Sequence, residues 1–272
     1  MKPVSFEYER PQTLKDAHSI LQERNGESKI LSGGQSLGPM LNLRLVQPKT
    51  LIDVSNLPDL VHAEDRSRSV IIGACVTHAN IEDRLVPDPS HGMMPCLASG
   101  IAYRAVRNRG TIGGSLCHAD PAADWISILT ALDAKITISG HRGRRVVPIS
   151  SFVKTVFDVD LATDELLESI EIPRLSDKAR WGYYKFCRKT GEFAEAIGVV
   201  VIDPCSDICR FVIGATSGAP YIVPGADSFL TSTSEVRQSS IMNLLIEKEM
   251  SDLYERELHV VALERALQRA NA

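Results

Sequence analysis

The chain has 272 residues, of which 44% are hydrophobic and 24% are charged, which is ordinary usage for a globular protein. This composition excludes disorder, collagen and a coiled-coil rod as the main state, and the length suits one large domain or two modest ones. The net charge of −4 gives no general reason to expect nucleic acid or an anionic membrane as a partner.

No segment is apolar over the roughly 20 residues that a membrane-spanning helix needs, and the longest apolar run is 196–202. Residues 1–10 lack the apolar core of a signal peptide, so we expect a cytoplasmic chain without a membrane span. The six cysteines are scattered and form no Cys-x-x-Cys pair. We therefore expect them to be reduced and mostly structural, and we expect no zinc or iron–sulfur site made by this chain alone.

The first predicted helix begins after Thr13, which can cap it, with Asp16 at the capping-box position. Its apolar residues recur at helical spacing, and Asn25-Gly26 ends it. A short apolar strand over 29–31 follows, and then the glycine loop 32–36. This order is the opposite of a Rossmann unit, in which a strand, a G-x-G-x-x-G loop and a helix follow one another, and that fingerprint is absent from the sequence.

The middle of the chain alternates between predicted strands and helices. Strands are predicted over 50–54, 70–74, 134–138 and 166–172, the last closed by Pro173. Helices are predicted over 77–85, capped by Thr77, over 93–104, and from Asp120-Pro121 onward, with proline at the first helical position. A second glycine loop is predicted over 111–115 and a hairpin tip over 141–145.

The pattern changes near residue 176. Three strand candidates follow in sequence, over 181–187, 196–202 and 209–215. The tail, 239–270, is predicted as two helices, the second capped by Ser251 or Asp252. We therefore expect a boundary near residue 175 between an α+β part and a small sheet with terminal helices.

The two Gly-Gly pairs, Gly33-Gly34 and Gly113-Gly114, are the most informative feature for function. Glycine lets successive backbone N–H groups turn toward one point, which creates a binding site for an anion. Two such loops could hold a pyrophosphate from two sides, with the hydroxyls of Ser36, Thr111 and Ser115 as further donors. Each pair taken alone is more simply explained as a tight turn, because Gly-Gly is foremost a turn signal. Neither pair leads into a Walker A motif, which disfavours a kinase or NTPase.

Other polar groups carry less information. Cys117 and His118 could form half of a metal site, but no second pair of ligands lies near them in the sequence. Arg104, Arg107 and Arg109 form a basic cluster, which is either a solvated loop face or a surface for a phosphate or a partner subunit. No Ser-His-Asp or Cys-His order is discernible, so we assign neither a catalytic residue nor a metal ligand.

Two stretches, 32–44 and 106–124, resemble the two flavin loops of the FAD-binding medium subunit of molybdenum hydroxylases. This family includes the carbon monoxide dehydrogenase medium subunit and the FAD domain of xanthine dehydrogenase. Residues 166–173 and 184–191 match later segments of the same family in the same order. The resemblance implies an α+β fold with a vanillyl-alcohol-oxidase-like (PCMH-type) FAD-binding domain over 1–175, divided into subdomains of about 1–57 and 58–175. It also implies a CO dehydrogenase flavoprotein C-terminal-like domain over 176–272, with a three-stranded antiparallel sheet and helices.

The resemblance further implies a set of cofactor-binding residues. The two glycine loops would hold the FAD pyrophosphate through backbone amides and hydroxyls, and the other residues would contact or line the flavin. The implied set is Ser32, Gly33, Gly34, Gln35, Ser36, Leu37, Ile101, Thr111, Ile112, Gly113, Gly114, Ser115, Asp124, Leu167, Lys185 and Phe193. From the residues alone, Asp124 is also explained as a carboxylate in the first turn of a helix, and Phe193 as a core aromatic. Residues 100–106 depart from the family, because many relatives carry a glycine and a proline there.

The function implied by the resemblance is that of the FAD-carrying medium subunit of a heterotrimeric molybdenum hydroxylase. Such a chain would pass electrons from the [2Fe-2S] clusters of a small partner subunit through FAD to an external acceptor. A large partner subunit would hold the molybdopterin, and the heterotrimers would pair into dimers. Two alternatives remain open, a stand-alone FAD-dependent oxidoreductase of the same fold and a non-enzymatic scaffold subunit that has lost the cofactor.

Overall fold

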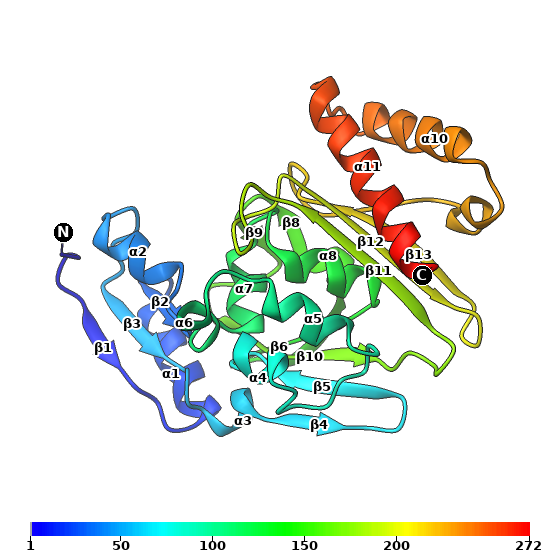
Figure 1. The fold of residues 1–272 in the computed structure, drawn as a ribbon. Helices are drawn as coiled ribbons and strands as arrows, with labels where there is room; N and C mark the ends of the chain where they lie inside the picture. Colours follow the sequence, from blue (N-terminus) through cyan, green and yellow to red (C-terminus); the bar gives the residue numbers. More distant parts are fainter. Residues whose placement is uncertain (1) are drawn as a thin grey trace.

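The computed structural model describes residues 2–272, which begin with a small parallel sheet. Its strand order is β1-β3-β2, from β1 (Glu7–Glu9), β2 (Ser28–Leu31) and β3 (Thr50–Asp53). Helix α1 (Leu14–Arg24) connects β1 to β2 and buries its apolar face with residues of β3. Thr13 Oγ1 accepts a hydrogen bond from Asp16 N at 3.1 Å, and Asn25 ends the helix with a left-handed φ of 42°, as the sequence predicts. Helices α2 (Leu37–Asn42) and α3 (Pro58–Val61) follow β2 and β3 (Figure 1).

The second sheet is antiparallel, with the order β4-β5-β10-β6-β7. Its strands are β4 (Ala63–Asp65), β5 (Ser69–Gly73), β10 (Glu165–Pro173), β6 (Lys135–Gly140) and β7 (Gly143–Pro148). The elements inserted between β5 and β10, besides β6 and β7, are α4 (His78–Glu82), α5 (Met93–Ser99), α6 (Arg104–Arg107), α7 (Ile112–His118), α8 (Asp124–Ala131), α9 (Ile149–Phe152), and the short pair β8 (Val153–Thr155) and β9 (Asp158–Val159). Figure 1 shows α7 and α8 between this sheet and the C-terminal sheet.

The C-terminal sheet has the order β11-β12-β13-β14, from β11 (Arg180–Phe186), β12 (Ala196–Asp203), β13 (Ile208–Gly214) and β14 (Tyr221–Ile222). A 3₁₀ helix over Ala226–Leu230 and the helices α10 (Ser234–Glu247) and α11 (Leu253–Ala270) complete the chain. One face of this sheet packs on α8 and the other on α11, so that β12 is buried along its whole length. One core cluster therefore joins apolar residues of α8 to residues of β12 and β13.

Several helix predictions were wrong in extent. The helix predicted over 93–104 ends at Ser99 and a second short helix begins only at Arg104, because Ala102 between them adopts a left-handed φ of 43°. The helix predicted over 77–85 ends at Glu82, although Thr77 does cap it. The helix predicted from Asp120-Pro121 begins at Asp124, because Asp120 instead forms a turn in which its Oδ1 accepts from Ala122 N at 3.0 Å.

The predictions for the strands and the tail were mostly confirmed, with three corrections. The C-terminal sheet has a fourth strand, β14, which pairs with Val212 and Ile213 and was not predicted. The hairpin tip is only the turn before Gly143, because β7 already begins there. The tail helices begin at Ser234, earlier than predicted, and Asp252 caps the second of them.

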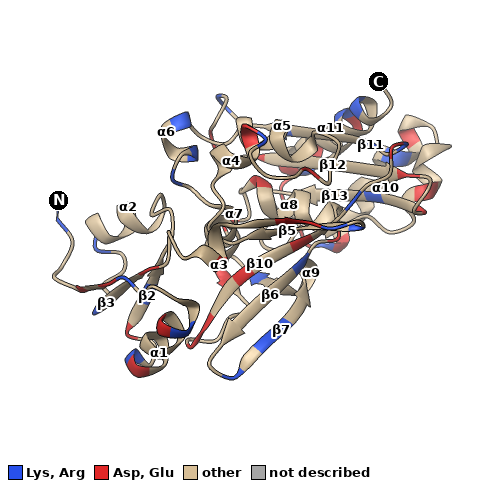
Figure 2. Ribbon diagram, turned by 90° about the horizontal axis from the view of Figure 1, so that it is seen from below, with Lys and Arg blue, Asp and Glu red and all other residues tan. Residues whose placement is uncertain are grey.

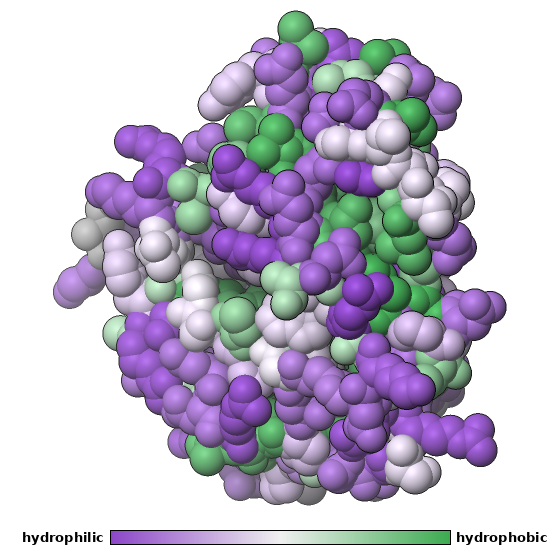
Figure 3. Space-filling view, turned by 45° about the vertical axis from the view of Figure 1, so that its right-hand side comes forward, coloured by the Kyte–Doolittle hydropathy of each residue, from purple (hydrophilic) through white to green (hydrophobic). Residues whose placement is uncertain are grey.

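The surface of the molecule is ordinary for a globular chain. Lysine and arginine side chains are spread over several elements, including β7 and α6 (Figure 2). In the space-filling view hydrophilic residues predominate, and apolar residues form limited patches (Figure 3). Within residues 2–272, no helix has both the length and the apolar character to cross a membrane.

Candidate functional site

A cavity of about 1080 Å³ is lined by residues that range from Leu21 to Glu195. Its volume is at the upper end of the range of small-molecule and cofactor sites. The wall is formed by β2 and the loop after it, by α7, and by the loop between β11 and β12. Every residue of the predicted cofactor-binding set lines this cavity except Ile112 and Lys185.

The loop after β2 presents unpaired backbone donors. Among the described residues, the backbone N–H groups of Gly33, Gly34, Gln35 and Ser36 form no hydrogen bond to a backbone carbonyl. Gly34 has a φ of +73°, which residues with a side chain rarely adopt and which turns the chain at this point. Gln35 Nε2 donates to Gly33 O at 3.3 Å. Consecutive free N–H groups in such a turn are suited to an anion.

The second glycine segment is not a loop, which corrects the sequence prediction. Residues 112–115 form the first turn of α7, and Thr111 is the residue that caps this helix. The backbone N–H groups of residues 112–115 already donate within the chain. Those of residues 112 and 113 donate to Val76 O at 3.1 Å and Ala74 O at 2.9 Å. Those of residues 114 and 115 donate to Oγ1 and O of Thr111, both at 3.0 Å. The segment therefore offers the hydroxyl of Ser115 to the cavity rather than backbone amides.

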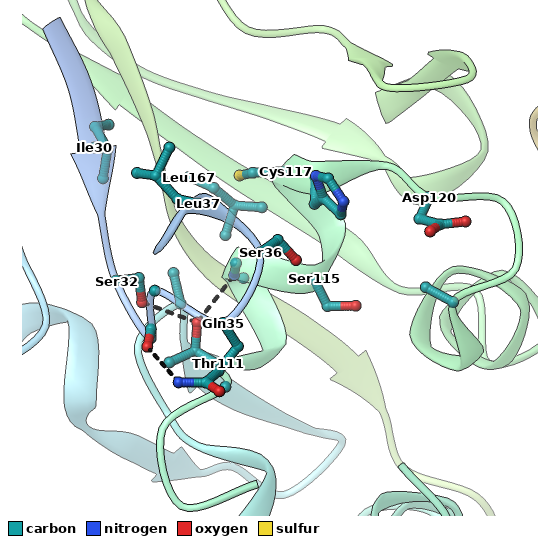
Figure 4. Close-up of a pocket in the computed structure, with 18 of the residues that line it drawn as sticks. Ile30, Ser32, Gln35, Ser36, Leu37, Thr111, Ser115, Cys117, Asp120 and Leu167 are labelled. Atoms are coloured by element: carbon teal, nitrogen blue, oxygen red, sulfur yellow. Dashed lines mark hydrogen bonds between the residues drawn. The ribbon is translucent and has the colours of Figure 1, made fainter. Parts of the chain in front are cut away.

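Glycines of both segments allow close packing against other parts of the chain. A Cβ on Gly33 would lie 2.1 Å from Arg109 O, and a Cβ on Gly113 would lie 2.5 Å from Ala74 Cβ. The hydroxyls of Ser32 and Thr111 are 2.9 Å apart, within hydrogen-bond distance (Figure 4). The first loop and the start of α7 are thereby fixed to each other, and Ser36 and Ser115 line the same cavity.

Asp124 lines the cavity, and Lys185 is connected to the cavity by its contact with the Asp124 carboxylate. Lys185 Nζ lies 3.0 Å from Asp124 Oδ1 and 3.2 Å from Oδ2, and both side chains are about nine-tenths buried. The hydroxyl of Tyr183 also donates to Asp124 Oδ1. Burial, together with the charge of Asp124, raises the pKa of Tyr183 well above its usual value. Lys185, which the resemblance assigns to the cofactor site, therefore does not line the cavity itself but contacts the wall residue Asp124.

The apolar members of the predicted set divide into wall and core. Leu37, Ile101 and Leu167 line the cavity, whereas Ile112 is fully buried in the core of the second sheet. Phe193 lies at the cavity with 66% of its surface exposed, so the alternative of a core aromatic is wrong.

Sequence reasoning missed His78, which also lines the cavity. Its Nδ1 accepts from Trp125 Nε1 at 3.1 Å, which leaves Nε2 as the protonated nitrogen of a neutral ring. Burial, with a smaller effect from Arg107, lowers the pKa of His78 to about 4. In the sequence, His78 is distinguished only by its position directly after the helix cap Thr77. That position does not predict the hydrogen bond with Trp125 of α8.

The sulfur and imidazole groups near the cavity do not form a metal centre. Burial raises the pKa of Cys75 to about 11 and that of Cys117 to about 12, so both thiols stay protonated at neutral pH. The ring of His118 packs on Phe157 with centroids 5.0 Å apart. Over residues 2–272, no three metal-binding side chains come together in one place.

The basic cluster is mostly neutralised by α4. Arg104 pairs with Glu82 at 2.8 Å and with Asp83, and Arg107 pairs with Glu82 at 2.7 Å. Arg107 also donates to the carbonyl oxygens of residues 101 and 102, which supports the irregular backbone between α5 and α6. Both arginines therefore have acidic partners within the chain, and Arg107 also supports a loop of the cavity wall.

The chain is similar to a family of known flavoproteins. Residues 4–175 match the family model described as "FAD binding domain in molybdopterin dehydrogenase". The nicotine 6-hydroxylase medium subunit of Paenarthrobacter nicotinovorans is 35% identical over 237 residues, which are 86% of this chain and 82% of the relative. The carbon monoxide dehydrogenase medium chain of Hydrogenophaga pseudoflava is 34% identical over 81% of this chain and 77% of its own length.

Solved structures show the same similarity. A structure of carbon monoxide dehydrogenase from Hydrogenophaga pseudoflava contains a chain with a TM-score of 0.90 and 29% identity, over 99% of this chain and 98% of that chain. A chain of quinoline 2-oxidoreductase from Pseudomonas putida 86 gives a TM-score of 0.86 and 27% identity, over 100% and 99% of the two chains. The whole chain, including the C-terminal sheet and helices, therefore has a counterpart in these structures.

Proposed function

Because this chain belongs to the family of FAD-binding domains found in molybdopterin dehydrogenases, we propose that it is the subunit through which electrons leave a molybdenum hydroxylase. Its cofactor is FAD, and it is a subunit of an oxidoreductase. In this proposal the chain receives electrons from the [2Fe-2S] clusters of a small partner subunit and passes them to an external acceptor. A large partner subunit holds the molybdopterin, and the heterotrimers pair into dimers.

The observation that carries this proposal is the run of free backbone N–H groups from Gly33 to Ser36 at a cavity of about 1080 Å³. An anion of the size of a pyrophosphate suits these donors, and the hydroxyls of Ser36 and Ser115 add two more. The residues present therefore fit FAD. In this assignment the loop after β2 binds the pyrophosphate, and α7 positions that loop through Thr111.

The remaining wall residues orient the cofactor and exclude water. Leu37, Ile101 and Leu167 provide apolar surface, Phe193 covers the rim, and Asp124 provides an acceptor. Bound FAD supplies the redox chemistry, while the protein supplies position and electrostatics. Apolar walls strengthen the polar contacts made within the cavity, because they lower the local dielectric constant.

The proposal assigns no substrate-specific residue to this chain. The similar proteins are named for nicotine, carbon monoxide and quinoline, although they share the fold of this chain. What they have in common with it is therefore the FAD-binding part, and the choice of substrate is assigned to the large partner subunit.

The proposal extends to the domain organisation. Residues 1–57 and 58–175 would be the two subdomains of a vanillyl-alcohol-oxidase-like FAD fold, and 176–272 the C-terminal domain. The first division falls between β3 and β4, which belong to different sheets, and the second falls between β10 and β11. The proposed complex is placed in the cytoplasm.

The test is the visible absorption spectrum of the complex that copurifies with this chain from its native host. We expect flavin bands together with a broad iron–sulfur shoulder, and both should bleach when a substrate of the complex is added. Flavin bands alone would point to a stand-alone oxidoreductase instead. A preparation that is colourless even after FAD is added would leave only a scaffold.

A further inference from the structure

Two side chains of β11 extend to the cavity wall without lining the cavity themselves. Tyr183 and Lys185 both contact the carboxylate of Asp124, the first residue of α8. We propose that Tyr183 is a positioning residue that acts with Lys185 to hold the side chain of Asp124 in place as a hydrogen-bond acceptor for bound FAD. This inference rests on the proposed function, because it assumes that FAD occupies the cavity.

The strand geometry places both donors on one side of the sheet. Side chains alternate across a strand, so Tyr183 and Lys185 share a face, while Gly182 and Tyr184 point the other way. The face of Gly182 packs on α11, since a Cβ there would lie 1.8 Å from Ala266 O. The face of Tyr183 is therefore the one turned toward α8 and the cavity.

The donors leave part of the carboxylate for the cavity. Asp124 Oδ1 accepts hydrogen bonds from the hydroxyl of Tyr183 and from Lys185 Nζ. Among the described residues, only Lys185 Nζ, at 3.2 Å, donates to Oδ2. A carboxylate oxygen can accept more than one hydrogen bond, so Oδ2 retains capacity for an N–H or O–H group of FAD. Tyr183 stays a donor at all working pH values because its pKa lies well above the usual range.

The arrangement also controls charge at the wall. A carboxylate with about a tenth of its side chain exposed is costly unless a cation or hydrogen bonds compensate it. Lys185 supplies the positive charge opposite the carboxylate of Asp124. Tyr183 supplies a hydrogen-bond donor without changing the net charge of this group. The cavity therefore meets an anionic cofactor with a compensated pair rather than with a free negative charge.

The test is a double-mutant cycle on FAD affinity in the full-length chain. We expect Tyr183→Phe to weaken FAD binding by about three- to tenfold, because hydrogen bonds to charged groups are among the stronger ones. If Tyr183 acts through Asp124, the same substitution should have no further effect in an Asp124→Asn background. The dissociation constants are measured from the change in flavin fluorescence on binding.

Tyr184→Phe is the matched control, since it makes the same change on the opposite face of the same strand, where the hydroxyl contacts Arg265. It should leave FAD affinity unchanged. The inference would be overturned if Tyr183→Phe reduced FAD affinity by the same factor in the wild-type and Asp124→Asn backgrounds. It would also be overturned if Tyr184→Phe reduced FAD affinity as much as Tyr183→Phe does. Thermal unfolding followed by circular dichroism shows that each variant is folded before its affinity is interpreted.

The reduction potential of bound FAD gives a second readout. Lys185→Met removes the compensating charge, so we expect a lower midpoint potential, since a nearby negative charge disfavours uptake of electrons. Lys185→Arg should restore the potential, and so should Lys185→Met combined with Asp124→Asn. An unchanged potential in Lys185→Met would contradict the inference while leaving the proposed function intact, whereas a wild-type chain that binds no FAD would overturn the proposed function itself.

Discussion

At the scale of single residues, Thr111 performs two tasks with one hydroxyl. Its Oγ1 caps α7 by accepting from Gly114 N at 3.0 Å, and it lies 2.9 Å from the Ser32 hydroxyl across the cavity edge. The loop after β2 and the start of α7 are thereby connected next to the free backbone donors of the first loop.

We predict that Thr111→Val lowers the free energy of unfolding by about 1–3 kcal/mol, because a helix cap and a side-chain hydrogen bond are lost together. FAD affinity should fall as well. Thr13→Val is the matched control, since Thr13 caps α1 in the same way but does not line the cavity. It should cost about 1 kcal/mol and leave FAD affinity unchanged, measured by urea unfolding and flavin titration. Equal effects of the two variants on affinity would contradict this assignment.

His78 predicts a pH dependence of stability. Its folded-state pKa of about 4 lies below the ordinary value of 6.5, so between these pH values the unfolded chain binds a proton that the folded chain does not. The free energy of unfolding is therefore highest above pH 6.5 and should fall by on the order of 2 kcal/mol between pH 7 and pH 5. His78→Asn keeps a polar side chain that does not titrate, so urea unfolding of that variant should show a smaller fall. An identical fall in both proteins would remove His78 as the cause.

At the scale of elements, local signals were sufficient where the structure depends on neighbours in sequence. The helix α1 was predicted correctly because its cap, its apolar spacing and its end at Asn25 all lie within it. The break between α5 and α6 was not, because residue 101 bridges to Gly191 far along the chain. The turn in the first glycine loop was predictable from its glycine pair. The pairing of the α7 amides was not, since their acceptors Ala74 and Val76 are contributed by an earlier segment.

The contact between α11 and the C-terminal sheet depends on two strand glycines, Gly182 and Gly198, which both lie against the backbone of α11. Gly182→Ala should lower the free energy of unfolding by about 1–3 kcal/mol or more, because the new methyl group meets the backbone of α11 at Ala266 O. Gly218→Ala is the control, since its nearest neighbour is Thr155 Cα at 3.9 Å. That variant should be neutral or slightly stabilising. Similar melting temperatures for the two variants would contradict the close packing of α11.

At the scale of the whole molecule, the second sheet and the C-terminal sheet share one interior. Every residue of α8 is buried, and the core cluster that contains it includes Ile197, Val199 and Val212 of the C-terminal sheet. The boundary near residue 175, which the sequence indicates by a change of pattern, therefore crosses a shared core. Sequence patterns indicate where helices and strands end, but they do not indicate which helix and sheet faces pack against each other in the folded chain.

We predict that a fragment of residues 1–175 does not fold cooperatively. Removal of β12 and β13 would expose the apolar surface of α8, and removal of β11 would leave Asp124 without Tyr183 and Lys185. The fragment should bind a hydrophobic dye and should retain little FAD. Thermal unfolding and flavin titration of the fragment and the full chain test this expectation. A fragment with a cooperative transition and the affinity of the full chain would contradict it.

The range of the cavity lining, from Leu21 to Glu195, also has a consequence for biosynthesis. A chain emerging from the ribosome makes the glycine loop 32–36 early but completes the opposite wall of the cavity only after more than two thirds of its length has been translated. At about 5–20 residues per second, the interval between the two lasts on the order of ten seconds or more. We therefore expect the chain to bind FAD only late in its synthesis, around the time when translation ends.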